Sequence, residues 1–201
     1  MTTFIKKNRT LKFVSQRLVR FLDCCKGVAS IEFAMVVPIM VLMFIGTVEL
    51  SQAITVDRRV NQVASSTADL IARTKSTTTT ELSGIMDVID ELMKPYDHSP
   101  VKLTIFNVIA STSDETNTVV CWSYEHNGGA SSYSNGSAYT LPTGVVEKGE
   151  SVIVAEISYA YTPLLFQHFL PSATTFTDTF YLKPRLSSSI EFNSVKCTAP
   201  A

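Results

Sequence analysis

An acidic residue lies inside an apolar run near the start of the chain. The sequence from Phe33 to Val48 carries no charge, and Val28 to Ile31 extends the run toward the N-terminus past Glu32. A carboxylate near the centre of a bilayer costs about 2.5 to 3.5 kcal/mol on insertion scales. Glu32 therefore needs either a place at the cytoplasmic interface, where it reaches the head groups, or a positive partner.

Cleavage of the chain after Gly27 would create such a partner. The new N-terminus at Val28 would carry a positive α-amine, one helical turn from Glu32 or opposite the Glu32 of a neighbouring subunit. Glu32 would then set the register between subunits. A helix of this kind can pass from lipid into a packed helical filament, because both surroundings are apolar.

Cys121 and Cys197 are the candidate disulfide. Both flank sheet-like segments of the predicted exported region, where oxidising conditions permit disulfides. A bond between them would close a long loop and contribute on the order of 4 kcal/mol if unstrained. Two separate thiols are the alternative. Cys24 and Cys25 belong with the segment before the apolar run, where juxtamembrane palmitoylation is the alternative role.

Catalysis finds little support in the sequence. His98, His126 and His168 are single histidines on loop-like segments, without the paired spacing of a zinc site, and we expect each at the surface. Neither a G-x-S-x-G elbow nor a Gly-rich phosphate loop is present. The sequence predicts no catalytic residue, metal, cofactor or small-molecule substrate. A tethered periplasmic enzyme, whose Ser, His and Asp side chains converge only in space, is the third-ranked alternative.

A membrane-spanning helix is the element that must position Glu32. Residues 28–48 supply roughly the 20 residues that cross a bilayer. Seven cations precede the run, opposed only by Asp23: Lys6, Lys7, Arg9, Lys12, Arg17, Arg20 and Lys26. Positive flanks are retained in the cytoplasm, so residues 1–27 are predicted to be a cytoplasmic leader and everything from Glu49 onward to be exported.

Two features of the run leave alternatives open. Pro38 removes a backbone donor and either loosens the helix locally or is a harmless membrane proline. A cleavable secretory signal, with Ser51 and Ala53 as a weak cleavage site, is the alternative to a permanent span.

The net charge of −1 and the pI near 6.3 give no reason to bind nucleic acid.

The exported part begins with helical patterns. Val56, Val60, Val63, Thr67 and Leu70 recur at spacings of four and three, which predicts a helical stalk over residues 49–75 that continues the membrane helix. Its apolar stripe meets either a partner or the protein's own domain. A second helical pattern begins at Glu81, runs to Met93, and is stopped by Pro95.

The remaining sequence reads as strands packed on helices, so residues 76–201 are predicted to be a small antiparallel-sheet domain and the whole chain to be α+β. The expected strands are Val101–Ala110, Thr118–Tyr124, Ser151–Tyr161 and Thr174–Leu182, with an edge at Leu186–Phe192. Gly128 to Gly144 is a polar loop. Aromatics around it form either an adhesive or ligand-binding face or a buried Trp with ordinary loop tyrosines: Trp122, Tyr124, Tyr133 and Tyr139.

The stretch KGVASIEF, Lys26 to Phe33, resembles a type IV prepilin processing site, in which a basic leader ends in Gly and is followed by Glu and Phe. The longer stretch GVASIEFAMVVPIMVLMFIGTVEL resembles the opening of the TadE/TadG-like proteins of the tight-adherence (Flp) pilus. Marks of this resemblance are the Glu32-Phe33 pair, Pro38, Gly46 and Glu49. Two later segments, Tyr159 to Leu165 and Lys183 to Arg185, are similar to C-terminal segments of the same proteins.

The resemblance implies a pseudopilin or minor pilus subunit that supports Flp pilus assembly and surface attachment, matured by a prepilin peptidase after Gly27. The implied partners are the bacterial inner membrane, the peptidase, other pilins or pseudopilins and the Tad assembly proteins. The major Flp pilin is much shorter, and larger relatives carry the same helix without being evident peptidase substrates. An uncleaved, membrane-anchored periplasmic binding or adhesin module is therefore the alternative.

Overall fold

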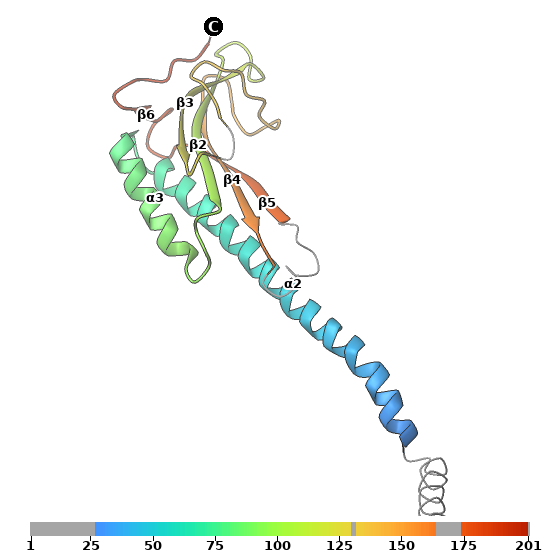
Figure 1. The fold of residues 1–201 in the computed structure, drawn as a ribbon. Helices are drawn as coiled ribbons and strands as arrows, with labels where there is room; N and C mark the ends of the chain where they lie inside the picture. The colour runs from blue at the N-terminus through green and yellow to red at the C-terminus, as the bar shows by residue number, and fades with distance from the viewer. Residues whose placement is uncertain (1–26, 130–131, 164–173, 201) are drawn as a thin grey trace, which may run out of the picture. The chain divides into compact units, whose positions relative to one another are not determined.

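The computed structural model describes residues 27–129, 132–163 and 174–200. The basic leader with Cys24 and Cys25 and the residue His168 lie outside the described residues. The chain forms two compact units, Met1–Val48 and Glu49–Ala201. The elements in order are α2 (Val28–Ala72), β1 (Ser76–Thr77), α3 (Thr79–Met93), β2 (Val101–Ala110), β3 (Thr118–His126), β4 (Ser151–Tyr161), β5 (Thr174–Leu182) and β6 (Glu191–Phe192), as Figure 1 shows. The predicted α+β class, with a long N-terminal helix before a short helix and an antiparallel sheet, is confirmed.

Helix α2 is apolar over its first half and amphipathic over its second. From Glu49 onward, one stripe of its side chains is buried: Val56, Val60, Val63, Ala64, Thr67, Ala68 and Ile71. These side chains join one core with the sheet and α3, so the stripe meets the protein's own domain. The predicted stripe member Leu70 is 46% exposed, because the helical period carries the stripe from Thr67 to Ile71 instead.

Helix α3 begins two residues earlier than the predicted Glu81. The hydroxyl of Thr78 accepts from the Glu81 N–H, and the Glu81 carboxylate accepts from the Thr78 N–H, so a capping box fixes the first turn. The helix ends at Met93, before Pro95. Its buried side chains follow spacings of four and three: Leu82, Met86, Ile89 and Met93.

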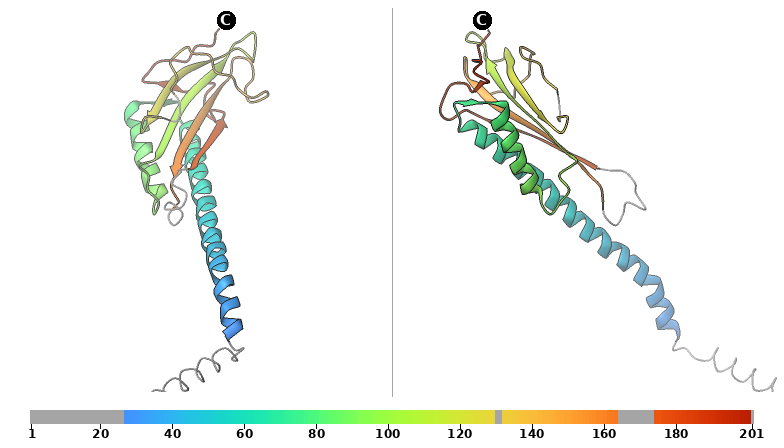
Figure 2. Two further views of the ribbon diagram at one scale, coloured as in Figure 1. Left: turned by 45° about the vertical axis from the view of Figure 1, so that its right-hand side comes forward. Right: turned by 60° about the vertical axis from the view of Figure 1, so that its left-hand side comes forward.

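The main sheet has the strand order β3-β2-β4-β5, and all three pairings are antiparallel. The second half of α2 and α3 cover one face, as the two views of Figure 2 show. The other face carries a smaller core, which is covered by side chains of the segment between β3 and β4 and joined by Tyr181 of the sheet itself: Tyr133, Tyr139, Leu141 and Val145 form this cover. Because both faces are covered, β2 and β4 are apolar on both sides rather than alternating.

The last strand differs from the predicted edge at Leu186–Phe192. Only Glu191–Phe192 forms a strand, and it pairs in parallel with β1 outside the main sheet. Just before this strand, the Ile190 carbonyl accepts hydrogen bonds from two side chains, Trp122 Nε1 (2.9 Å) and Asn107 Nδ2 (3.3 Å). A carbonyl held by side chains is not available to a sheet ladder.

Candidate membrane-anchor and assembly site

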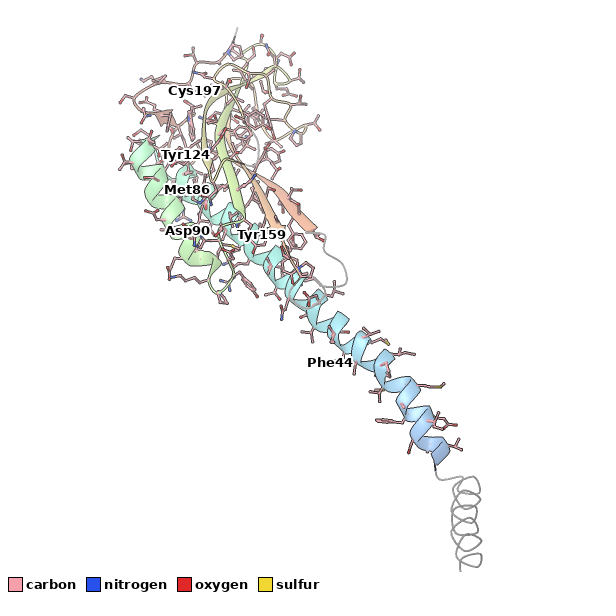
Figure 3. All side chains as sticks on the ribbon, in the orientation of Figure 1. Phe44, Met86, Asp90, Tyr124, Tyr159 and Cys197 are labelled. Atoms are coloured by element: carbon pink, nitrogen blue, oxygen red, sulfur yellow. A yellow bond between two sulfur atoms is a disulfide. The ribbon has the colours of Figure 1, made fainter. Side chains whose placement is uncertain are left out.

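The first half of α2 presents apolar side chains that nothing in the described chain covers. Side chains such as Phe44, which Figure 3 labels, are mostly exposed, with exposed fractions of 72% for Met35 and 70% for Phe44. In the part of the chain that the structure describes, this is one helix that is long and apolar enough to cross a membrane. An apolar surface of this size requires a lipid environment or packing against other apolar helices.

The residues of the proposed processing site lie at the start of this helix. Gly27 immediately precedes α2, and a Cβ atom added there would meet no other atom within 4 Å. Packing in the folded chain therefore does not demand glycine at this position. Val28 and Glu32 are four residues apart in the helix and share one face. Phe33, beside Glu32, is 67% exposed. Cleavage after Gly27, and the roles of Glu32 and Phe33, stay predictions.

Pro38 lies inside α2, and the helix continues through it in both directions. Proline supplies no N–H to the carbonyl one turn earlier, at Ala34. In an apolar environment that carbonyl needs another donor or a local adjustment of the helix. A local loosening of the helix at Pro38 stays a prediction, with a harmless membrane proline as its alternative.

At the end of the apolar run, Glu49 is buried within the second unit. Its exposed fraction is 8%, and it begins the stripe of α2 that packs on the sheet. Burial raises the pKa of the Tyr161 hydroxyl, and the nearby negative charge of Glu49 raises it further. The structure thus brings together Glu49 and Tyr161, which lie in two segments that carry the family resemblance.

Tyr159, two residues earlier on the same face of β4, extends this cluster. Its hydroxyl donates to the Asp97 carbonyl at 3.1 Å, and its pKa is raised, chiefly by burial. Tyr96 lies close enough to affect both β4 tyrosines electrostatically. Figure 3 shows Tyr159 between the sheet and the helices. The sequence placed Tyr159 and Tyr161 in a predicted strand and in a segment of the resemblance, but it did not show their neighbours, because periodicity does not reveal which helix a strand contacts.

The second resembling segment, Lys183 to Arg185, holds the C-terminal end of α2. The Arg185 N–H donates to the Ala72 carbonyl at 2.8 Å, and its guanidinium pairs with Asp69, which also pairs with Arg73 one turn on. Lys183 pairs with Glu150 at 2.7 Å, and the hydrogen bond from Lys183 lowers the pKa of the Glu150 carboxyl. The backbone contact caps a helix end whose last carbonyls have no partner within the helix.

The structure joins Cys121 and Cys197 in a disulfide, with their Cα atoms 5.3 Å apart. Beside it, the Trp122 ring stacks on Phe192 at 5.1 Å and is 5% exposed. A recess of about 380 Å³ opens here, and its lining includes Trp122, Phe192, Asn135 and Lys196.

The aromatic residues around the Gly128 to Gly144 loop do not share one face. Trp122 and Tyr124 pack with the core on the helix side, whereas Tyr133 and Tyr139 pack on the opposite core. The hydroxyls of Tyr133 and Tyr139 each donate to Glu156 Oε1 at 3.0 Å. Of the two alternatives, the structure shows the buried Trp122 rather than a continuous adhesive face.

His98 lies at the surface as expected, with its side chain 46% exposed, whereas His126 ends β3 and is largely covered. His98 Nδ1 lies 3.2 Å and His126 Nε2 lies 3.6 Å from Asp90 Oδ1, on the α3 residue that Figure 3 labels. The His126 side chain is only 16% exposed. Within residues 27–129, 132–163 and 174–200, however, no three His, Cys, Asp or Glu side chains are grouped so that they could hold a metal ion.

Together these features define an α+β protein whose N-terminal helix is long and apolar enough for a membrane anchor. The model of the TadE-like protein family matches residues 27–69, which is 43 of the 201 residues. The matched segment begins at Gly27 and ends at Asp69, so the similarity lies in the apolar run and the part of α2 that follows it. The comparisons with curated proteins and with solved structures gave no match.

Proposed function

We propose that this protein is a pseudopilin or minor subunit that supports assembly of the tight-adherence (Flp) pilus and, through it, surface attachment. Its role is structural rather than enzymatic. The N-terminus faces the cytoplasm, α2 spans the bacterial inner membrane once, and the domain from Glu49 onward lies in the periplasm. Its partners are the prepilin peptidase, other pilins or pseudopilins, and the Tad assembly proteins.

The observation that carries the proposal is the TadE-like match over residues 27–69. It covers the candidate cleavage point, the acid in the apolar run and the first part of the helix that packs on the domain. The uncovered apolar side chains of residues 28–48 support the same proposal, because they suit both lipid and the core of a helical filament.

Glu32 supplies the proposed chemistry of assembly. After cleavage at Gly27, the α-amine of Val28 is positive below its pKa of about 8 and lies one turn from the Glu32 carboxylate. An ion pair in an apolar environment is far less costly than an isolated carboxylate. A pair formed between neighbouring subunits would also fix their relative height.

The test of maturation is the intact mass and N-terminal sequence of the protein from native membranes, in strains with and without the prepilin peptidase. A start at Val28 that depends on the peptidase supports the proposal. A start at Met1 in both strains makes the protein a permanent anchor. A start after Ala53 means that α2 was cut as a secretory signal, which overturns the proposed topology.

The test of assembly is Glu32→Ala, with Thr47→Ala as a matched control in the same helix. The Thr47 hydroxyl donates to the Met43 carbonyl one turn earlier in the same helix, at 2.9 Å. Loss of this hydroxyl should leave assembly unchanged. Glu32→Ala should insert in the membrane as the wild type does and lower the number of pili. Unchanged piliation would remove Glu32 from the mechanism.

A membrane-anchored binding module is the second candidate, and the recess beside Trp122 and Phe192 is the observation that favours it. Aromatic and amide side chains of this kind suit a small polar ligand. A start at Met1, together with normal piliation in a strain that lacks the protein, would favour this candidate over the pseudopilin.

A further inference from the structure

The two edges of the main sheet are finished in different ways. The order β3-β2-β4-β5 makes β3 and β5 its outer strands. On the outer side of β3, the Val120 N–H donates to the Ser137 carbonyl at 2.8 Å, and the Gly136 N–H donates to the Val120 carbonyl at 2.7 Å. Beyond β5, which Figure 1 labels at the other edge, the described residues place no further strand. An unpaired edge of this kind is a template for a strand from another chain.

The register of the sheet shows which backbone groups of β5 lie at its free edge. Hydrogen-bonded and non-hydrogen-bonded pairs alternate along an antiparallel ladder. The Ala110 N–H donates to the Glu150 carbonyl at 3.0 Å, so the even-numbered residues of β4 bond to β2 and the odd-numbered ones to β5. Because Ile157 is paired with Asp178, the even-numbered residues of β5 bond to β4. The odd-numbered residues of β5 therefore point their N–H and C=O groups outward: Thr175, Thr177, Thr179 and Tyr181.

One of these outward groups is already occupied by a side chain of the strand itself. The Thr179 N–H donates to Asp178 Oδ1 at 2.7 Å. The carboxylate of Asp178 therefore lies at the free edge, at the place where an added strand would need to bring a carbonyl. It disfavours strand addition because it holds the donor and because its charge would lose water in the new contact.

The sequence of β5 makes a second copy of the same strand a well-matched partner for this edge. Residues Phe176 to Phe180 read FTDTF, which is the same in both directions. An antiparallel pair centred on Asp178 would place each Phe opposite a Phe and each Thr opposite a Thr, and such pairs stabilise a sheet. The same register places Asp178 opposite the Asp178 of the second copy, in a non-hydrogen-bonded pair whose side chains are close. Like charges directly opposite each other are destabilising.

We propose that Asp178 prevents the β5 edge from pairing with the β5 edge of a second copy of this chain. Without its charge, two domains would join their sheets across a two-fold axis at this residue. With the charge, this edge stays unpaired, and contacts between copies are left to other surfaces. The inference goes beyond the proposed function, because it concerns the sheet alone and holds whether or not the chain enters a pilus.

The test compares three variants of the full-length protein in detergent with the wild type. Asp178→Asn removes the charge but keeps an oxygen for the Thr179 N–H, so it stays informative if Asp178→Thr, which removes both, does not fold. Asp178→Lys exchanges one like-charge pair for another. Asp87→Asn, at an exposed position of α3, is the control for the loss of one negative charge. Light scattering measures the protein mass, and hydrogen exchange of the Thr177 amide reports pairing at the β5 edge.

In Asp178→Asn and Asp178→Thr we expect the mass to at least double relative to the wild type and exchange of the Thr177 amide to slow. Asp178→Lys alone should match the wild type, whereas its mixture with the wild type should pair, because the charges that face each other are then opposite.

Four results would overturn the proposal. The neutral variants could keep the mass and the exchange of the wild type, or the Thr177 amide could already be protected in the wild type. The mixture could gain no protection, which would show that the two charges do not face each other. Association of Asp87→Asn in the same way would show that the net charge of the protein, and not the place of Asp178, keeps the copies apart.

Discussion

Glu156 is a carboxylate on the face of the sheet away from the helices, held by two tyrosine hydroxyls. Tyr133 and Tyr139 reach it from the segment between β3 and β4, and their rings pack edge to face at 5.4 Å and against Phe106. A partly buried carboxylate needs such donors, because its lone pairs have lost water. The hydroxyls thus fasten the polar loop over the second core.

Removal of these hydroxyls should destabilise the domain. Hydrogen bonds to charged groups contribute about 1.5 to 3 kcal/mol each, so Tyr133→Phe and Tyr139→Phe should each lower the free energy of unfolding by about that amount. Urea denaturation of the full-length protein in detergent measures it. Tyr124→Phe, which packs on the helix side of the sheet, is the control and should cost less. Equal losses in all three variants would contradict the role of Glu156.

The buried tyrosines also predict a loss of stability at high pH. Burial raises the pKa of Tyr139, Tyr159 and Tyr161, so the folded state keeps protons that the unfolded state loses from about pH 10. The stabilisation that these protonated tyrosines give the folded state is fully present below about pH 10, and it is lost as the pH rises toward their pKa values in the folded state. Tyrosine absorbance and circular dichroism against pH should show exposed tyrosines ionising first and the buried ones only as the domain unfolds. Ionisation of all seven tyrosines in one step, with the fold intact, would contradict this.

At the scale of elements, the end of α2 depends on a segment more than 100 residues later in the chain. Arg185 caps the Ala72 carbonyl and pairs with Asp69, whose side chain is 25% exposed. The helix therefore docks on the sheet through its apolar stripe and is fastened at its end by polar contacts. Of the two later segments named in the resemblance, one holds Tyr161, whose pKa is raised in part by the charge of Glu49, and the other holds Arg185, which pairs with Asp69.

Arg185→Ala should cost about 0.5 to 1 kcal/mol, because Arg185 is exposed and solvent weakens its ion pair. Asp69→Ala should cost more, since it removes the partner of both Arg185 and Arg73. Urea denaturation at low and high salt measures both, and salt should reduce the difference from the wild type. Lys196→Ala is the control, because its pair with Glu191 is long (3.6 Å) and its side chain is 80% exposed. A cost for Arg185→Ala no larger than the control would contradict the fastening role.

Local sequence predicted the elements well where burial is uniform. The bounds of β2, β4 and β5 agree with the structure, because β-branched and aromatic runs end at turn residues there. The start of α3 was misplaced, although Thr78 and Glu81 have the spacing of a capping box and could have shown it. The edge strand was wrong over Leu186–Ile190, where the Ile190 carbonyl accepts from side chains of β2 and β3 and the Ser188 carbonyl accepts from the N–H and hydroxyl of Ser151.

At the scale of the molecule, the contacts around the candidate site join distant parts of the sequence. Glu49 and Tyr161 are 112 positions apart, and so no local period predicts their proximity. The proximity of His126 to Asp90, 36 positions earlier, also follows from the fold and not from a local period. The helix of the candidate site could be predicted from the sequence by its resemblance. The contacts of that helix with the sheet could be seen only in the folded structure.

The disulfide should set the stability of the second unit. Loss of the cross-link in Cys121→Ser/Cys197→Ser opens a loop with a sequence separation of 76 and should lower the free energy of unfolding by about 4 kcal/mol. Thermal denaturation with and without a reductant measures it. The reductant should destabilise the wild type and leave the double variant unchanged. A reductant-insensitive wild type would show that the two thiols are not joined in the native protein.

The order of synthesis determines when that disulfide can form. Cys121 leaves the ribosome 76 residues before Cys197, which is about 4 to 15 s at ~5–20 residues per second. Ile190, the acceptor for Trp122, and β6, the partner of β1, are also made late. Through that interval the helices and β3 have been synthesised but lack their closing segment. The newborn domain therefore holds a free thiol beside an exposed tryptophan for several seconds, and is vulnerable to wrong pairing until synthesis reaches Cys197.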